Sequence, residues 1–86
     1  RLTVDTAVAA EQTAAAELQS VAAKLENAGR EVLRLTALFE SHVAPEKEYR
    51  DALTVRDIAA AVVAMGRARV AERHAEVQRL QTMLRK

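Results

Sequence analysis

The chain has no cysteine, one proline, two glycines and two aromatic residues among its 86 residues. Without cysteine it can form no disulfide and no thiolate metal site. Most β-rich folds need a turn signal about every 8–12 residues, and three glycine and proline residues cannot supply them. No apolar run approaches the roughly 18 residues of a membrane span, and a net charge of +1 indicates no general attraction to nucleic acid. These absences leave a helical chain as the favoured class.

The residues that are present favour helices with a thin core. Nineteen of the 43 hydrophobic residues are alanine. Alanine has the highest helix propensity but buries little apolar area, so a compact globular core would be weakly stabilised. The sequence therefore predicts an all-α protein whose helices pack as a coiled coil.

Pro45, near the midpoint, divides the chain into two predicted helices. The residue before a proline is pushed out of the α region, while proline itself suits the first turn of a helix. We expect a helix over about 5–43, a turn at about 44–45 and a second helix over about 46–85. The alternative is a break near Leu53, because Thr54 followed by Asp57 resembles a capping box.

Apolar residues recur at alternating steps of four and three in the first half, which predicts a coiled-coil seam. This seam comprises Ala14, Leu18, Val21, Leu25, Ala28, Val32, Leu35, Phe39 and His42. The second half carries a less regular pattern, with Ala52, Val55, Ala59, Val62, Met65, Val70, Val77, Leu80 and Leu84. Folding back at Pro45 gives an antiparallel two-helix hairpin in which facing residue numbers add to about 90, so Leu35 lies beside Val55 and Leu38 meets only Ala52.

Charge favours the same pairing. Residues 1–43 carry four basic and six acidic side chains, and residues 44–86 carry nine basic and six acidic ones. Opposite net charges of −2 and +3 favour contact between the two halves over self-pairing, although each exposed ion pair contributes only a few tenths of a kcal/mol.

No residue pattern indicates catalysis, a metal or a cofactor. The two histidines, His42 and His74, fall far apart along the predicted hairpin, and a metal needs three or four converging ligands. Ser20 and Ser41 have no base and orienting acid at a suitable spacing. The sequence therefore predicts no catalytic residues, no metal site and no cofactor.

Three segments near the midpoint resemble the α-helical hairpin of periplasmic adaptor proteins, also called membrane fusion proteins, of the HlyD-like superfamily. They are Ala23–Ala28, Arg34–Phe39 and Val43–Ala52. In that family the hairpin tip carries an arginine, a leucine four residues later and a serine seven residues beyond. The matching positions here are Arg34, Leu38 and Pro45, so a proline stands where the family has its serine.

The resemblance implies an interaction and spacer element rather than an enzyme. Such adaptors join an inner-membrane transporter to a TolC-type outer-membrane duct in tripartite efflux or secretion systems. The implied partners are the duct, through Arg34, Leu38 and Pro45, and neighbouring adaptor hairpins, while the transporter is contacted by other domains. The implied location is the periplasm. Because the chain starts with Arg1 and holds only a hairpin, we expect a segment of a longer, membrane-anchored adaptor.

Two other functions fit the same helices. One is a cytoplasmic coiled-coil module for dimerisation or secretion-chaperone work. The other is a basic helical nucleic-acid binder that uses the C-terminal basic residues Arg67, Arg69, Arg73, Arg79, Arg85 and Lys86. Single-stranded nucleic acid would need aromatic stacking partners beside these residues, and that part of the sequence has none.

Overall fold

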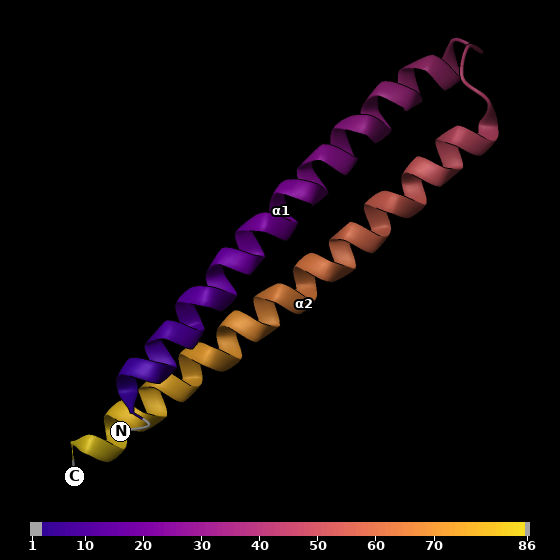
Figure 1. Cartoon of the computed structure of the whole chain (residues 1–86). Helices are drawn as coiled ribbons and strands as arrows, with labels where there is room; N and C mark the ends of the chain where they lie inside the picture. The colour runs from indigo at the N-terminus through magenta and orange to yellow at the C-terminus, as the bar shows by residue number, and fades with distance from the viewer. Residues whose placement is uncertain (1–2, 86) are drawn as a thin grey trace.

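The computed structural model describes residues 3–85 as two long helices that lie antiparallel to each other (Figure 1). Helix α1 spans Val4–Glu40 and helix α2 spans Glu46–Leu84. The pair measures 66 × 14 × 13 Å, so it is an elongated rod two helices thick. The predicted all-α hairpin is confirmed. Lys86 of the basic group lies outside the described residues, and no helix within them is long and apolar enough to cross a membrane.

The seam predicted for α1 is confirmed as far as Phe39. Ala14, Val32 and Leu35 are buried. The other apolar positions of the pattern between them and up to Phe39 are half-buried. His42 does not belong to the seam, because it is exposed and lies beyond the end of the helix.

The first helix ends earlier than predicted, at Glu40 rather than near Val43. His42 takes the left-handed conformation, with φ at 61°. The amide of His42 donates to the carbonyl of Phe39 at 3.0 Å, and the amide of Val43 donates to that of Leu38 at 2.7 Å. These two bonds form a Schellman motif, which satisfies the last carbonyls of a helix and reverses the chain. The connection therefore occupies residues 41–45 instead of 44–45.

The longer connection changes the register between the helices. Glu17 pairs with Arg69, Phe39 stacks on Tyr49 and Glu11 contacts His74, so facing residue numbers add to about 85–88 rather than 90. The buried residues of α2 are therefore Ala52, Val63 and Val77. Half-buried Arg56 and Gly66 continue this seam at heptad spacing. The predicted α2 seam was wrong at Val55, Val62, Met65 and Leu84, which are exposed.

Helix α2 runs without a break past Leu53. The Thr54 hydroxyl donates to the carbonyl of Arg50, one turn earlier, at 3.2 Å, which is the bond of a threonine inside a helix rather than at its start. The alternative of two shorter helices in this half is therefore wrong.

One ion pair and one histidine–carboxylate hydrogen bond join the helices within residues 3–85. Arg69 lies 3.7 Å from Glu17, and Nδ1 of His74 lies 2.8 Å from Glu11. The remaining ion pairs of this part of the chain are formed within α1 or within α2. Packing along the seam, more than the predicted attraction of opposite charges, holds the hairpin closed.

Candidate functional site at the hairpin tip

The tip of the hairpin has its own small apolar core. Val32, Leu35 and Ala52 are buried together, and Leu38, Ala44, Tyr49 and Leu53 pack against them. Phe39 and Tyr49 stack across the two helices, with ring centroids 4.9 Å apart and planes 10° from parallel. These are the only aromatic residues of the chain, and both lie at this end. The tip is therefore a packed element rather than a loose loop.

Leu38 contributes to this core and is half-buried. Its carbonyl also accepts hydrogen bonds from the amides of Val43 and Ala44, at 2.7 and 3.1 Å. The sequence interpretation paired Leu38 with Ala52 alone and left it free for partners. The structure places Leu38 mainly in the tip core, so its replacement would disturb the tip itself.

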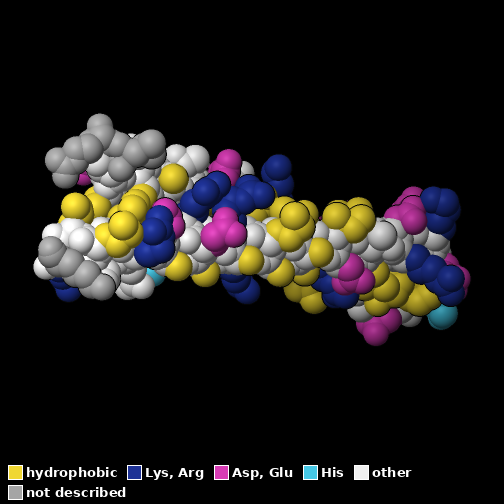
Figure 2. Space-filling view, turned by 90° about the horizontal axis from the view of Figure 1, so that it is seen from below, with side chains coloured by type: hydrophobic (Ala, Val, Ile, Leu, Met, Phe, Trp, Pro, Cys, Tyr) yellow, Lys and Arg dark blue, Asp and Glu magenta, His cyan; other side chains and the backbone are white. Residues whose placement is uncertain are grey.

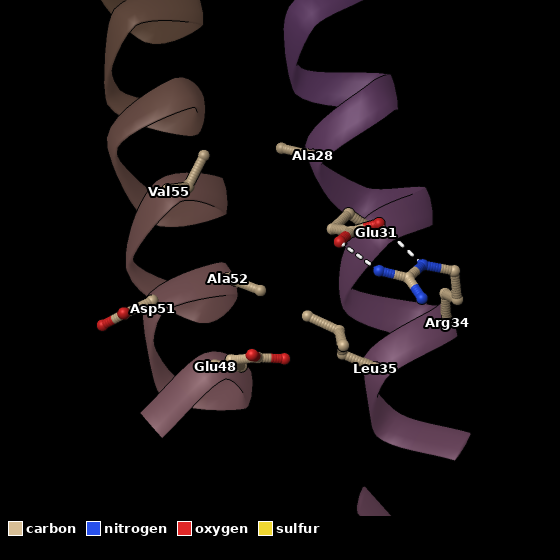
Figure 3. A pocket seen from close by; sticks show the side chains of 8 residues that line it. All are labelled: Ala28, Glu31, Arg34, Leu35, Glu48, Asp51, Ala52 and Val55. Atoms are coloured by element: carbon tan, nitrogen blue, oxygen red, sulfur yellow. Dashed lines mark hydrogen bonds and ion pairs between the residues drawn. The ribbon is translucent and has the colours of Figure 1, made fainter. Parts of the chain in front are cut away.

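Arg34 lies one turn before Leu38 on α1 and is exposed. Its Nε and Nη2 atoms donate to the two carboxylate oxygens of Glu31, at 2.9 and 2.7 Å (Figure 3). These bonds lower the pKa of the Glu31 carboxyl and raise the pKa of the Arg34 guanidinium. A forked pair of this kind fixes the direction of the guanidinium, and the remaining N–H groups stay free to bind carboxylates or carbonyls.

A shallow groove of about 320 Å³ lies beside this ion pair. Figure 3 shows Glu31 and Arg34 on α1 opposite Glu48 and Asp51 on α2, with Leu35 and Ala52 between the helices. The charge of Glu48 also contributes to raising the pKa of Arg34. The groove is therefore lined by three carboxylates and one guanidinium near the tip.

Pro45 is the N-cap of α2, one position before the first turn in which the sequence placed it. Its φ of −65° and ψ of 149° are extended, and no side chain caps the helix start. Glu46 and Glu48 occupy the first turn, where their negative charge complements the exposed amide groups of the helix end. Pro45 thus sets the direction in which the chain enters α2.

The sequence-predicted tip residues do not form one cluster. Arg34 and Leu38 share a face of α1, but Arg34 turns toward Glu31 while Leu38 turns into the core, and Pro45 begins the other helix. The apex is formed by His42 and Val43, which are both exposed. The sequence analysis missed Val43 as a surface residue. No sequence signal marked it, because the apolar residue that follows the left-handed position of a Schellman motif usually packs back on its helix, whereas Val43 is exposed.

Within residues 3–85, no group of three His, Asp or Glu side chains is placed to hold a metal ion. His74 lies against Glu11, toward the open end of the hairpin. His42 lies at the apex, so the two histidines do not meet.

Comparison with protein-family models, with curated proteins and with solved structures finds no significant match. The resemblance to periplasmic adaptors therefore rests on the residues of the tip and on the hairpin they form.

Proposed function

We propose that the chain is the α-helical hairpin of a periplasmic adaptor, and that its tip docks on a TolC-type outer-membrane duct. The observation that carries this proposal is a rod 66 Å long whose closed end is packed around a small apolar core. A two-helix rod needs no globular core and converts sequence length into reach at about 1.5 Å per residue. In this role the protein is a spacer and connector and not an enzyme.

The tip residues have different roles in this proposal. Arg34, held by Glu31, supplies directed N–H donors for carboxylates or carbonyls of the duct. The exposed side chain of Val43 supplies apolar contact at the apex. Leu38 and Pro45 support these groups by shaping the tip core and the chain reversal. Neighbouring hairpins and an inner-membrane transporter, the latter through other domains, complete the proposed assembly.

The test uses the adaptor that carries this hairpin, expressed in its Gram-negative host. Arg34→Asp or Val43→Asp should abolish transport while helicity and membrane localisation stay unchanged. Arg30→Asp is the matched control, since Arg30 is also exposed on α1 and pairs with an acid within the helix, Glu26 at 3.1 Å. If Arg34→Asp supports full transport, or Arg30→Asp abolishes it equally, the tip does not dock as proposed.

A further inference from the structure

The middle of α2 is apolar on all sides. Between Asp57 and Arg67 the nine residues are Ile58–Gly66, and none of them has a polar side chain. A helix that is apolar all round is normally buried all round. In this rod α1 covers only one side of α2, burying Val63 but leaving the side next to this seam in solvent.

The uncovered side carries a second heptad pattern, formed by Val55, Ile58, Val62 and Met65. We call these four residues the α2 stripe. Their exposed fractions are 57, 60, 39 and 63 %. Their spacing of three, four and three is that of a coiled-coil seam, running parallel to the one that contacts α1. In Figure 2 hydrophobic side chains are exposed along the rod between groups of charged ones.

The α2 stripe forms one wall of a long groove. Three adjoining hollows lie along it, and neighbouring hollows share lining residues: Ala28 and Val55 join the first two, and Val21 and Val62 join the second to the third. The middle hollow, of about 300 Å³, is lined by apolar residues apart from Lys24. A groove of this form fits the apolar side of another helix.

The charges at the two ends of the α2 stripe indicate which helix fits this groove. Asp51 lies one turn before the stripe and lines the groove near the tip, and Arg69 lies one turn after it and lines the groove at the other end. In an antiparallel pair of α2 helices whose residue numbers add to 120, Val55 faces Met65 and Ile58 faces Val62. In the same pair Asp51 of each chain faces Arg69 of the other.

No other alignment of two α2 helices brings these opposite charges together as well. A shift of one heptad either way places Asp51 against Val62 or Arg69 against Ile58. A parallel pairing of the two stripes places Asp51 against Asp51 and Arg69 against Arg69, and like charges in contact are unfavourable. Glu48 and Glu72, one turn further out, would face each other and so mark the ends of the contact.

We infer that the α2 stripe binds the α2 stripe of a second copy of this chain, antiparallel and about a twofold axis near residue 60. Such an interface is isologous, since each copy offers the same surface. The contact from Asp51 to Arg69 spans about 27 Å at 1.5 Å per residue. This inference does not rest on tip docking. A row of adaptor hairpins points all its tips one way, so the antiparallel pair would be a separate state of the chain.

The first test measures the mass of the 86-residue chain by sedimentation from about 1 µM to about 1 mM, the range of moderate self-association. The expected result is a dimer that Ile58→Glu converts to a monomer. Leu33→Glu is the matched control, because Leu33 is 72 % exposed on α1 and lines none of the three hollows. A wild-type chain that is monomeric throughout, or a dimer that survives Ile58→Glu, would overturn the inference.

The second test asks whether the pair is antiparallel. Asp51→Arg should weaken the dimer by at least about tenfold, and adding Arg69→Asp should restore it, because the exchanged charges face each other again. Chains with Val55→Cys should form disulfides when mixed with chains carrying Met65→Cys, and neither variant should do so alone. Disulfides within either variant alone, or no recovery in the double variant, would show a different arrangement.

Discussion

Phe39 and Tyr49 stack face to face across the hairpin, one from the last turn of α1 and the other from the first turns of α2. The stack closes the tip core on the side next to the chain reversal. It places the entire aromatic content of the chain at the end that we propose as the docking end.

The stack should be measurable as a coupling between the two rings. We expect a double-mutant cycle with Phe39→Leu and Tyr49→Leu to give about 0.5–1.5 kcal/mol of coupling in the free energy of unfolding, the range of stacked aromatic pairs. Urea unfolding followed by circular dichroism is the measurement. Two single variants whose effects simply add would mean that the rings contribute only through the apolar area they bury.

His42 has a left-handed backbone that disfavours any side chain with a Cβ atom. We expect His42→Gly to raise the free energy of unfolding by about 0.5–1 kcal/mol, because relief of the strain exceeds the entropy that glycine loses on folding. His42→Ala keeps the Cβ atom and should bring no such gain. Thermal unfolding of both variants is the measurement, and an equal gain from His42→Ala would contradict the explanation.

Substitution by alanine should change the free energy of unfolding differently at the two glycines. At Gly29 an added Cβ atom meets nothing within 4 Å, so Gly29→Ala should stabilise the rod by about 1 kcal/mol through helix propensity alone. At Gly66 the added atom lies 3.1 Å from Cδ1 of Leu18. Leu18 must shift to accept it, so the gain from Gly66→Ala should be smaller. Equal gains in urea unfolding would show that the seam is looser there than the structure indicates.

Acid should weaken the forked ion pairs of the rod. Arg34 lowers the pKa of Glu31, and Arg79, through hydrogen bonds at 2.9 and 2.7 Å, lowers the pKa of Glu76. A carboxyl whose pKa is lower in the folded state stabilises fully above its unfolded pKa of about 4.3, and this contribution is lost as pH falls through the folded pKa.

The variant Glu31→Gln with Glu76→Gln should therefore lose less stability than the wild type between pH 7 and pH 3, measured as the shift of the urea midpoint. Removing the partners instead, with Arg34→Gln and Arg79→Gln, should flatten the pH dependence in the same way. If both double variants follow the wild-type pH dependence, these pairs do not contribute to it.

The sequence predicted the fold and one half of the seam because both depend on a regular pattern. The α1 seam from Ala14 to Phe39 has no competing apolar stripe, so only one face of that helix could be buried. In α2 two stripes of equal spacing lie side by side, and pattern alone could not tell which one faces α1. The choice depends on where α1 ends, and that end is fixed by a left-handed histidine, a residue that gives a much weaker stop signal than glycine.

The candidate site was predicted less well than the fold for a related reason. Arg34 was placed correctly, on the surface and away from the seam. Leu38 was predicted to be available to a partner because a register sum of 90 set it against Ala52 alone. With the five-residue connection, Ala44 and Tyr49 also pack against the core to which it belongs.

The closed end of the rod also sets the order in which the two helices can join. Residues that meet near the tip, such as Phe39 and Tyr49, are close in sequence, whereas Glu11 and His74 are separated by more than 60 residues. Closing a short loop costs less chain entropy than closing a long one. The two helices therefore pair first at the tip and then progressively toward the open end. Each new turn of contact shortens the loop that the next contact has to close. Opening runs in the reverse order, so the helix ends opposite the tip separate first and exchange their amide hydrogens fastest, while the end that we propose to meet the duct stays closed longest.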